Sequence, residues 1–245
     1  MKKILLTSVT VILVLLIGGL AYLYFSLNDL VKKAVETVGP QITRTDVRLA
    51  SANLSPFSGS GRLTGFVVGN PEGFRGPYAL KLGSIAVSVD KASLLKETIV
   101  VNSIIIRNPA VSLIGTPAGN NLGKLLKNIQ SQDSSKTKEE KPSPSGASKK
   151  FFVKEVVISG ATLNVAASAL DQKIQQMLPI PDITIRNIGS DGAGVSAADL
   201  SRQILTPLIN ASIREGMNVL AKQGLQELQK RGAGELKKVL PGLFK

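Results

Sequence analysis

The chain has 245 residues, 43% of them hydrophobic and only 4% aromatic, so we expect one domain with an aliphatic core plus an appendage. Cys and His are absent, which excludes disulfides, thiolate nucleophiles, Cys/His zinc sites, Ser-His-Asp triads and histidine bases. The formal net charge of +13 fits an anionic partner such as acidic lipid or nucleic acid, and equally a uniformly solvated basic surface.

The N-terminal stretch has the composition of a membrane span. Lys2 and Lys3 precede an uncharged apolar run, Ile4 to Phe25, and about 20 such residues suffice for a helix across a bilayer. A cleaved signal peptide is the alternative, but its apolar region normally spans about 7–15 residues. We therefore interpret residues 1–27 as a transmembrane anchor. Because the lysines precede it, the positive-inside rule places the rest of the chain outside the cytoplasm.

Residues 28–130 are expected to contain a helix and the first part of a β-sheet. The helix is predicted over Leu27 to Val38, where apolar residues recur at helical spacing until Gly39-Pro40. From Ile42 onward, apolar and polar residues alternate with the period of a strand that buries one face. Asn-Pro and Gly-Pro pairs interrupt this pattern, since proline has no amide hydrogen for a strand ladder. Short strands are thus predicted throughout Gly61 to Ile114.

A second helix and a linker follow these strands. Asn120 to Ile129 has the spacing of a short amphipathic helix, with Asn120 or Asn121 as its N-cap. Residues 131–150 consist almost entirely of Ser, Lys, Glu, Pro and Gly. Such a segment cannot bury enough surface to offset its ordering entropy, so we interpret it as a disordered linker.

Strand patterns return in residues 151–195 and are expected to continue the same sheet. A weak internal repeat supports this, because Ile106 to Leu113 aligns with Ile158 to Val165 as strand, short corner and strand. Repetition of one such unit indicates a sheet that grows by adding copies of it.

The last segment, residues 196–245, is predicted to be an amphipathic helical region. Apolar residues between Leu205 and Ile213 are spaced for a helix that packs on the sheet. The pattern is expected to break at Gly224 and at Gly232-Ala233-Gly234, and the basic amphipathic helix beyond has two interpretations. It either lies on a membrane surface or caps an edge of the sheet.

The predicted fold is therefore mainly β with flanking α: an N-terminal transmembrane helix, a curved antiparallel β-sheet with a groove, and a C-terminal helical region. The apolar face of the sheet is either an ordinary core beneath helices or an open groove for lipid acyl chains. The candidate groove residues are Val47, Leu49, Leu63, Ile85, Val87, Val89, Ile104, Ile106, Val111, Leu113, Val156, Ile158, Leu163 and Val165.

The order of these pieces resembles the AsmA-like family, in which this chain would be a small member related to the N-terminal modules of AsmA, TamB and YhdP. The resemblance is carried by the anchor and helix, the strands around Val47 to Val68, Gly69-Asn70-Pro71-Glu72-Gly73-Phe74, Ile85 to Val89, Ser93-Leu94-Leu95-Lys96, and Ile99 to Ile106 running into Asn108-Pro109. It implies a curved sheet with an apolar concave face and a role in phospholipid movement or outer-membrane homeostasis.

The expected function follows from both lines of reasoning. We expect a non-enzymatic protein of the cell envelope, single-pass in the inner membrane with the bulk of the chain periplasmic, that binds phospholipid and uses no cofactor, metal or nucleic acid. The alternative is an accessory or assembly subunit that docks on another envelope protein or on a copy of itself. A hydrolase is disfavoured, since no Gly-x-Ser-x-Gly or other nucleophile motif is present.

Overall fold

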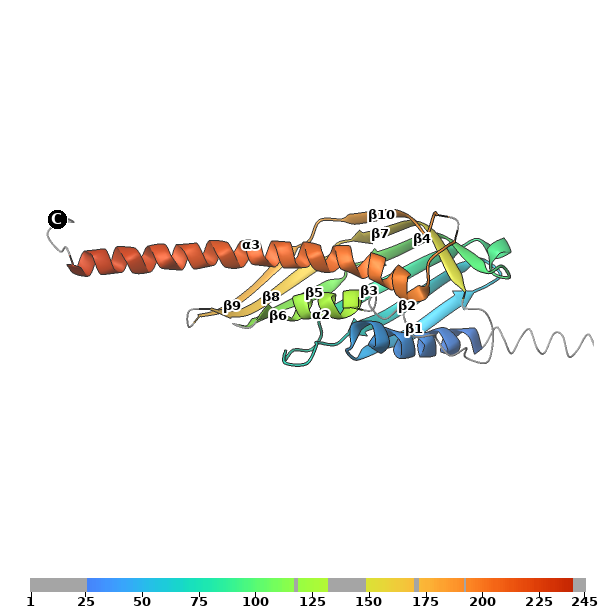
Figure 1. Cartoon of the computed structure of the whole chain (residues 1–245), viewed down its shortest axis with the longest axis horizontal. Helices are drawn as coiled ribbons and strands as arrows, with labels where there is room; N and C mark the ends of the chain where they lie inside the picture. The colour runs from blue at the N-terminus through green and yellow to red at the C-terminus, as the bar shows by residue number, and fades with distance from the viewer. Residues whose placement is uncertain (1–25, 117–118, 132–148, 170–171, 192, 240–245) are drawn as a thin grey trace, which may run out of the picture.

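The computed structural model describes residues 26–116, 119–131, 149–169, 172–191 and 193–239. The described chain is mainly β: a ten-stranded sheet curls into a half-barrel, and helices lie against it (Figure 1). The expected anchor, Ile4 to Phe25, lies outside the described residues, as does most of the expected linker. Within the described ranges, no helix is both long and apolar enough to cross a bilayer.

A helix over residues 26–43 opens the described chain, which confirms the predicted helix, but its expected end at Gly39-Pro40 is wrong because the helix continues through both residues. The sheet has the order β10-β7-β4-β3-β5-β8-β9, with β2 paired to β3, β1 paired to β2, and β6 paired to β5. The elements are β1 (Val47–Ser55), β2 (Ser60–Val68), β3 (Leu80–Val89), η1 (Lys91–Ser93), β4 (Thr98–Arg107), β5 (Ala110–Thr116), β6 (Gly119–Asn120), α2 (Asn121–Gln130), β7 (Lys150–Ser159), β8 (Thr162–Ala169), β9 (Gln172–Pro179), β10 (Ile183–Ile188) and α3 (Ala197–Val239).

The sheet is mixed, and the expectation of a purely antiparallel sheet is wrong. β4 pairs with β7, and β5 with β8, in the parallel direction, while the other pairings are antiparallel. Parallel neighbours need a crossover connection. The chain supplies one through β6, α2 and residues 131–149, which lead from the end of β5 back to the start of β7. Strands from both sides of the expected linker therefore lie side by side.

Three pairs of consecutive strands, β4 with β5, β7 with β8, and β9 with β10, each form one long row with a short corner. The register is unchanged across the first two corners, because Ile106 faces Ile158 just before them and Val111 faces Leu163 just after. These are the residues that the sequence repeat aligned, so the repeat is confirmed as two parallel neighbouring rows.

The corners have a special backbone. Asn108 and Gly160 both adopt a left-handed conformation, with φ of 50° and 65°. In the next row Gly83 faces the corner so closely that a Cβ there would lie 2.7 Å from the carbonyl oxygen of Arg107. Gly65, one row further, has φ of 64°. A line of bends thus crosses the sheet.

This line of bends changes which residues face the helices. Side chains three apart on a regular strand point to opposite faces, yet Leu82 is buried in the core and Ile85 packs against the same core. Aliphatic ladders therefore cross the same face on both sides of the bends. Their members, neighbour to neighbour, are Val47, Val68, Leu80, Val111, Leu163 and Leu178 on one side, and Leu63, Ile85, Ile106, Ile158 and Ile183 on the other.

α3 is one continuous helix of 43 residues, so the expected break at the glycines is wrong. A glycine inside a helix costs only about 1 kcal/mol, which the surrounding Leu, Gln, Glu and Lys residues tolerate. The first part of α3 packs on β5, β7, β8 and β10 and on α2. The remainder extends past the end of the sheet and does not run along a sheet edge (Figure 1).

The two edges of the sheet differ. At the β1 edge, the N–H of Leu49 donates to Glu36 Oε1 at 3.1 Å and the N–H of Leu54 donates to Asn28 Oδ1 at 2.9 Å. Lys32 Nζ donates to the carbonyl of Ala50 at 3.5 Å. Asn28, Lys32 and Glu36 are four residues apart and share one helix face. The helix thereby occupies backbone groups that would otherwise recruit another strand. β9 and β10 form the opposite edge.

The left-handed backbone at Asn108 predicts which substitutions this position tolerates. Asn108→Gly should change the free energy of unfolding by less than about 0.5 kcal/mol, because glycine adopts positive φ freely. Asn108→Val should destabilise by about 1–2 kcal/mol, because a β-branched residue strains in the left-handed region. Arg107→Val, at the exposed extended neighbour, is the matched control. Urea unfolding followed by circular dichroism measures all three, and equal stability of the two valine variants would contradict the strained corner.

The hydrogen bonds at the β1 edge predict that β1 opens more often when the acceptor Glu36 is removed. Glu36→Ala leaves the amide of Leu49 without its charged acceptor, a loss of about 1 kcal/mol that corresponds to roughly fivefold faster hydrogen exchange. Exchange mass spectrometry on peptides covering β1 measures this change. Lys33→Ala, on the exposed side of the same helix, should leave the exchange of β1 unaltered; the same acceleration in both variants would argue against edge sealing.

Candidate functional site

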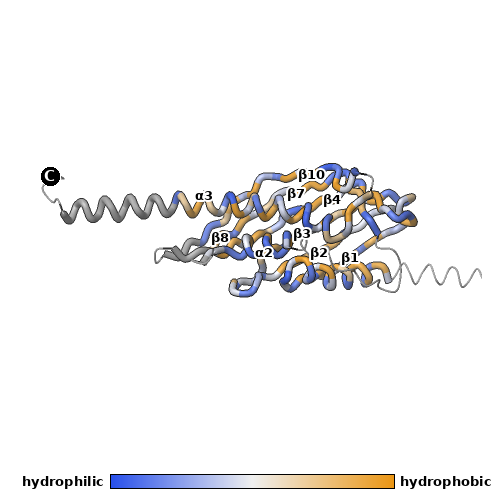
Figure 2. Tube along the Cα trace, viewed as in Figure 1, coloured by the Kyte–Doolittle hydropathy of each residue, from blue (hydrophilic) through white to orange (hydrophobic). Residues whose placement is uncertain are grey.

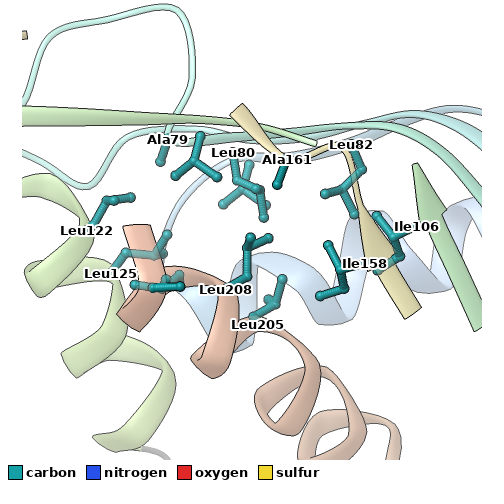
Figure 3. Close-up of a cluster of buried hydrophobic side chains, with 14 of the residues drawn as sticks. Ala79, Leu80, Leu82, Ile106, Leu122, Leu125, Ile158, Ala161, Leu205 and Leu208 are labelled. Carbon is teal, nitrogen blue, oxygen red and sulfur yellow. The ribbon is translucent and has the colours of Figure 1, made fainter. Parts of the chain in front are cut away.

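Much of the aliphatic face of the sheet is covered by helices. Leucines from α2 and α3 point toward the aliphatic residues of the sheet and fill the space between them (Figure 3). The labelled members are Leu122, Leu125, Leu205 and Leu208 from the helices, and Ala79, Leu80, Leu82, Ile106, Ile158 and Ala161 from the sheet and its connections. All of them are buried. This region is a hydrophobic core of close-packed alkyl groups.

The structure divides the fourteen candidate groove residues into two groups. Ten are buried, from Val156, Ile158 and Leu163 at 0% exposure to Ile104 at 8%. The rest of this group are Val47, Leu49, Ile106, Val111, Leu113 and Val165. The other four are half-buried and lie on β2 and β3, namely Leu63, Ile85, Val87 and Val89.

The half-buried group has a fifth member that the sequence pattern did not identify. Leu54, near the end of β1, is half-buried and faces Gly61 across the strand pair. A Cβ at Gly61 would overlap the side chain of Leu54, so this leucine lies across the glycine. We call Leu54, Leu63, Ile85, Val87 and Val89 the aliphatic strip.

The sequence pattern did not identify Leu54, because the bend shifts the alternation of side chains between the two faces of β1. Val47 and Leu49 set a period of two that would place residue 54 on the opposite face. The signals that could have located it are two glycines of β2, namely Gly61 opposite Leu54 and Gly65 at the bend, since isolated glycines in a strand mark bends or close approach.

The aliphatic strip lies on strands outside the main contact area of α3. α3 packs on β5, β7, β8 and β10, while the helix over residues 26–43 seals the outer edge of β1. The strip runs across β1, β2 and β3 between them. Ile85 and Val87 still contact the core, so the strip is continuous with it. Figure 2 shows apolar residues along these strands.

The chemistry of the aliphatic strip is limited to apolar contact, because its five side chains carry only alkyl groups. Covering such a surface contributes about 0.8 kcal/mol for each methylene removed from water. An alkyl chain or an apolar side chain from another protein can supply those methylenes. Among the described residues there is no group of three or more acidic residues placed to hold a metal ion.

A hollow lies away from the strip, beside the N-terminus of α2. It is open, has a volume of about 750 Å³, and is lined by Glu72, Gly73, Phe74, Gly119, Asn120, Gly123, Lys124, Lys127 and Asn128. Lys124 Nζ donates to the carbonyl of Glu72 at 2.9 Å, which ties its two sides together. The hollow contains none of the candidate groove residues, and its lining includes three charged side chains, those of Glu72, Lys124 and Lys127.

No family model, no curated protein and no solved structure matches this chain.

Proposed function

We propose that this protein is a small AsmA-like envelope protein that binds phospholipid acyl chains on its aliphatic strip. In this proposal residues 4–25 anchor it in the inner membrane, and the sheet lies in the periplasm. The protein helps to move phospholipid or to maintain the outer membrane without catalysing a reaction. The observation that carries the proposal is the half-buried row of five alkyl side chains on β1, β2 and β3.

The aliphatic strip supports lipid binding better than the rest of the apolar face does. Side chains such as Val156 and Ile158 are fully buried, so a ligand could reach them only by displacing α3. Val87 and Val89 need no such displacement, since they are already partly accessible. The resemblance to AsmA-like proteins and the curled sheet both favour a groove of this kind.

The alternative function, docking on another envelope protein, is supported by the β9–β10 edge. This edge pairs with the sheet on one side only. On it, Met177 is 68% exposed, which is unusual for a large apolar side chain. An edge strand of this kind can add a strand from a partner. Native mass spectrometry after gentle extraction separates the alternatives, because phospholipid would accompany a lipid-binding protein and a stoichiometric protein would accompany a docking subunit.

The lipid proposal is tested by placing one charge on the strip. Val87→Asp should leave the protein folded and abolish its cross-linking to a photoactivatable phospholipid, because a carboxylate in the strip repels alkyl chains. Val156→Asp buries an unpaired charge at a cost of several kcal/mol and should lose folded protein altogether. Val157→Asp is the matched control: Val157 is half-buried like Val87 but alternates to the opposite face of its strand.

The results for Val87→Asp and its control distinguish a lipid-binding strip from an ordinary core. Folded Val87→Asp protein that still cross-links as wild type, or equal loss in the Val157→Asp control, would overturn the assignment of the strip. Unfolding of Val87→Asp would show that the strip is part of an ordinary core, and the docking alternative would then be preferred.

A further inference from the structure

Large apolar side chains are exposed at one end of the sheet. Among the described residues, the exposed large hydrophobics are Leu95 at 96%, Phe57 at 79%, Met177 at 68%, Leu30 at 63% and Met217 at 49%. Phe57 lies in the turn between β1 and β2, Leu95 lies between β3 and β4, and Leu30 lies near the start of the first helix. We call these three segments, residues 26–30, 56–59 and 90–97, the tip.

Hydrogen bonds hold the three segments of the tip together. The N–H of Val89 donates to the carbonyl of Gly59 at 2.7 Å, which joins the two turns. The bond from the N–H of Leu54 to Asn28 Oδ1 holds the start of the helix beside the end of β1. The tip is therefore one surface.

The turn that carries Leu95 is itself well built. Asp90 Oδ1 accepts from the N–H of Ala92 at 3.0 Å. Ser93, fully buried, donates its hydroxyl to the carbonyl of Asp90 at 2.6 Å and accepts from the N–H of Val100 at 2.8 Å. Leu95 is thus exposed on a fixed scaffold, and its position on the outside of the turn is imposed by the fold.

The sequence places a membrane-seeking segment directly beside the tip. The apolar run Ile4 to Phe25 ends at the residue before Ser26, and Ser26 begins the first segment of the tip. No spacer separates the two. A bilayer that holds this run is therefore adjacent to Leu30, Phe57 and Leu95.

The tip itself carries no excess of positive charge. Within residues 26–30, 56–59 and 90–97, the basic residues are Lys91 and Lys96, and the acidic residues are Asp29, Asp90 and Glu97. Such a surface has no net attraction for anionic headgroups. Its affinity for a membrane would come from apolar insertion.

We propose that the tip docks on the surface of the bilayer that holds the N-terminal run, with Phe57 and Leu95 inserted among the lipids. Leu54 and Val89, at one end of the aliphatic strip, adjoin the two turns of the tip, so the docked tip places the strip against the lipid surface. The docking rests on the proposed membrane anchor, and the entry route rests in addition on the proposed lipid-binding strip.

The absence of Trp from the chain provides a clean test. The full-length variants Phe57→Trp and Leu95→Trp are reconstituted into phosphatidylcholine vesicles, with and without bromine atoms high on the acyl chains. Met177→Trp and Met217→Trp are the matched controls, since these methionines are also exposed but lie on β9 and α3. Brominated lipid should quench the fluorescence of both tip variants at least twofold and leave both controls unchanged.

Several results would overturn the docking. These are failure of the protein to float with the vesicles, equal quenching at all four positions, or no quenching at the tip. Protection of the tip from acrylamide without quenching by brominated lipid would show contact with a second copy of the chain, and would overturn it as well. Half-molar salt should leave the quenching of Leu95→Trp unchanged, because the tip carries no excess of positive charge; loss of quenching in salt would overturn apolar insertion.

The docking test and the lipid-binding test fail separately. Quenching at the tip together with normal cross-linking of Val87→Asp would overturn lipid binding by the strip and support the docking. Loss of cross-linking in folded Val87→Asp without quenching at the tip would support lipid binding by the strip and overturn the docking.

Discussion

The fold depends on the left-handed backbone at Asn108 and Gly160. Without these residues, the side chains of β4 and β5, and those of β7 and β8, would keep a single alternation, and Ile106 and Val111 would point to opposite faces. The bend restores both to one face, so a row twice the length of an ordinary strand keeps one continuous apolar side. Gly83 and Gly65 let the neighbouring rows follow the same line. The curled sheet, the core beneath α3 and the aliphatic strip all follow from it.

The sequence predicted the helices and strands better than it predicted how the strands pair in the sheet. Most of the strands, the first helix and α2 were recognisable from periodicity, although β6 and β9 were not. The N-cap of α2 is Asn120, whose side chain accepts from the N–H of Gly123. The repeat was recognisable because its corner falls at the same place in both copies. The parallel direction of the β4–β7 and β5–β8 pairs could not be predicted, since apolar and polar residues alternate in the same way in parallel and antiparallel strands that bury one face. Leu54 was missed because the bend lies between it and Leu49.

The role of one sequence motif became clear only in the structure. Asn70, in the turn-rich segment after β2, accepts a hydrogen bond from Asn121 at 2.7 Å. Asn121 is fully buried, donates to the carbonyl of Ser112 and accepts from the N–H of Ile114. One amide thus fastens the start of α2 to β5 and to a loop 51 residues away in sequence. No periodicity signals such a contact, because it depends on where the elements meet. The division of the apolar face into core and strip depends on helix placement in the same way.

The covered β1 edge leaves only the opposite edge of the sheet open to further strands. Asn28, Lys32 and Glu36 occupy the backbone of β1, so the first helix of the described chain covers this edge. Any lengthening by whole units must therefore occur on the far side, where the rows already repeat in register. Each added unit would carry its own corner on the line of bends and extend the concave face by one strand spacing, about 4.8 Å. A chain built this way can vary in the width of its sheet on one side while the sealed edge stays the same.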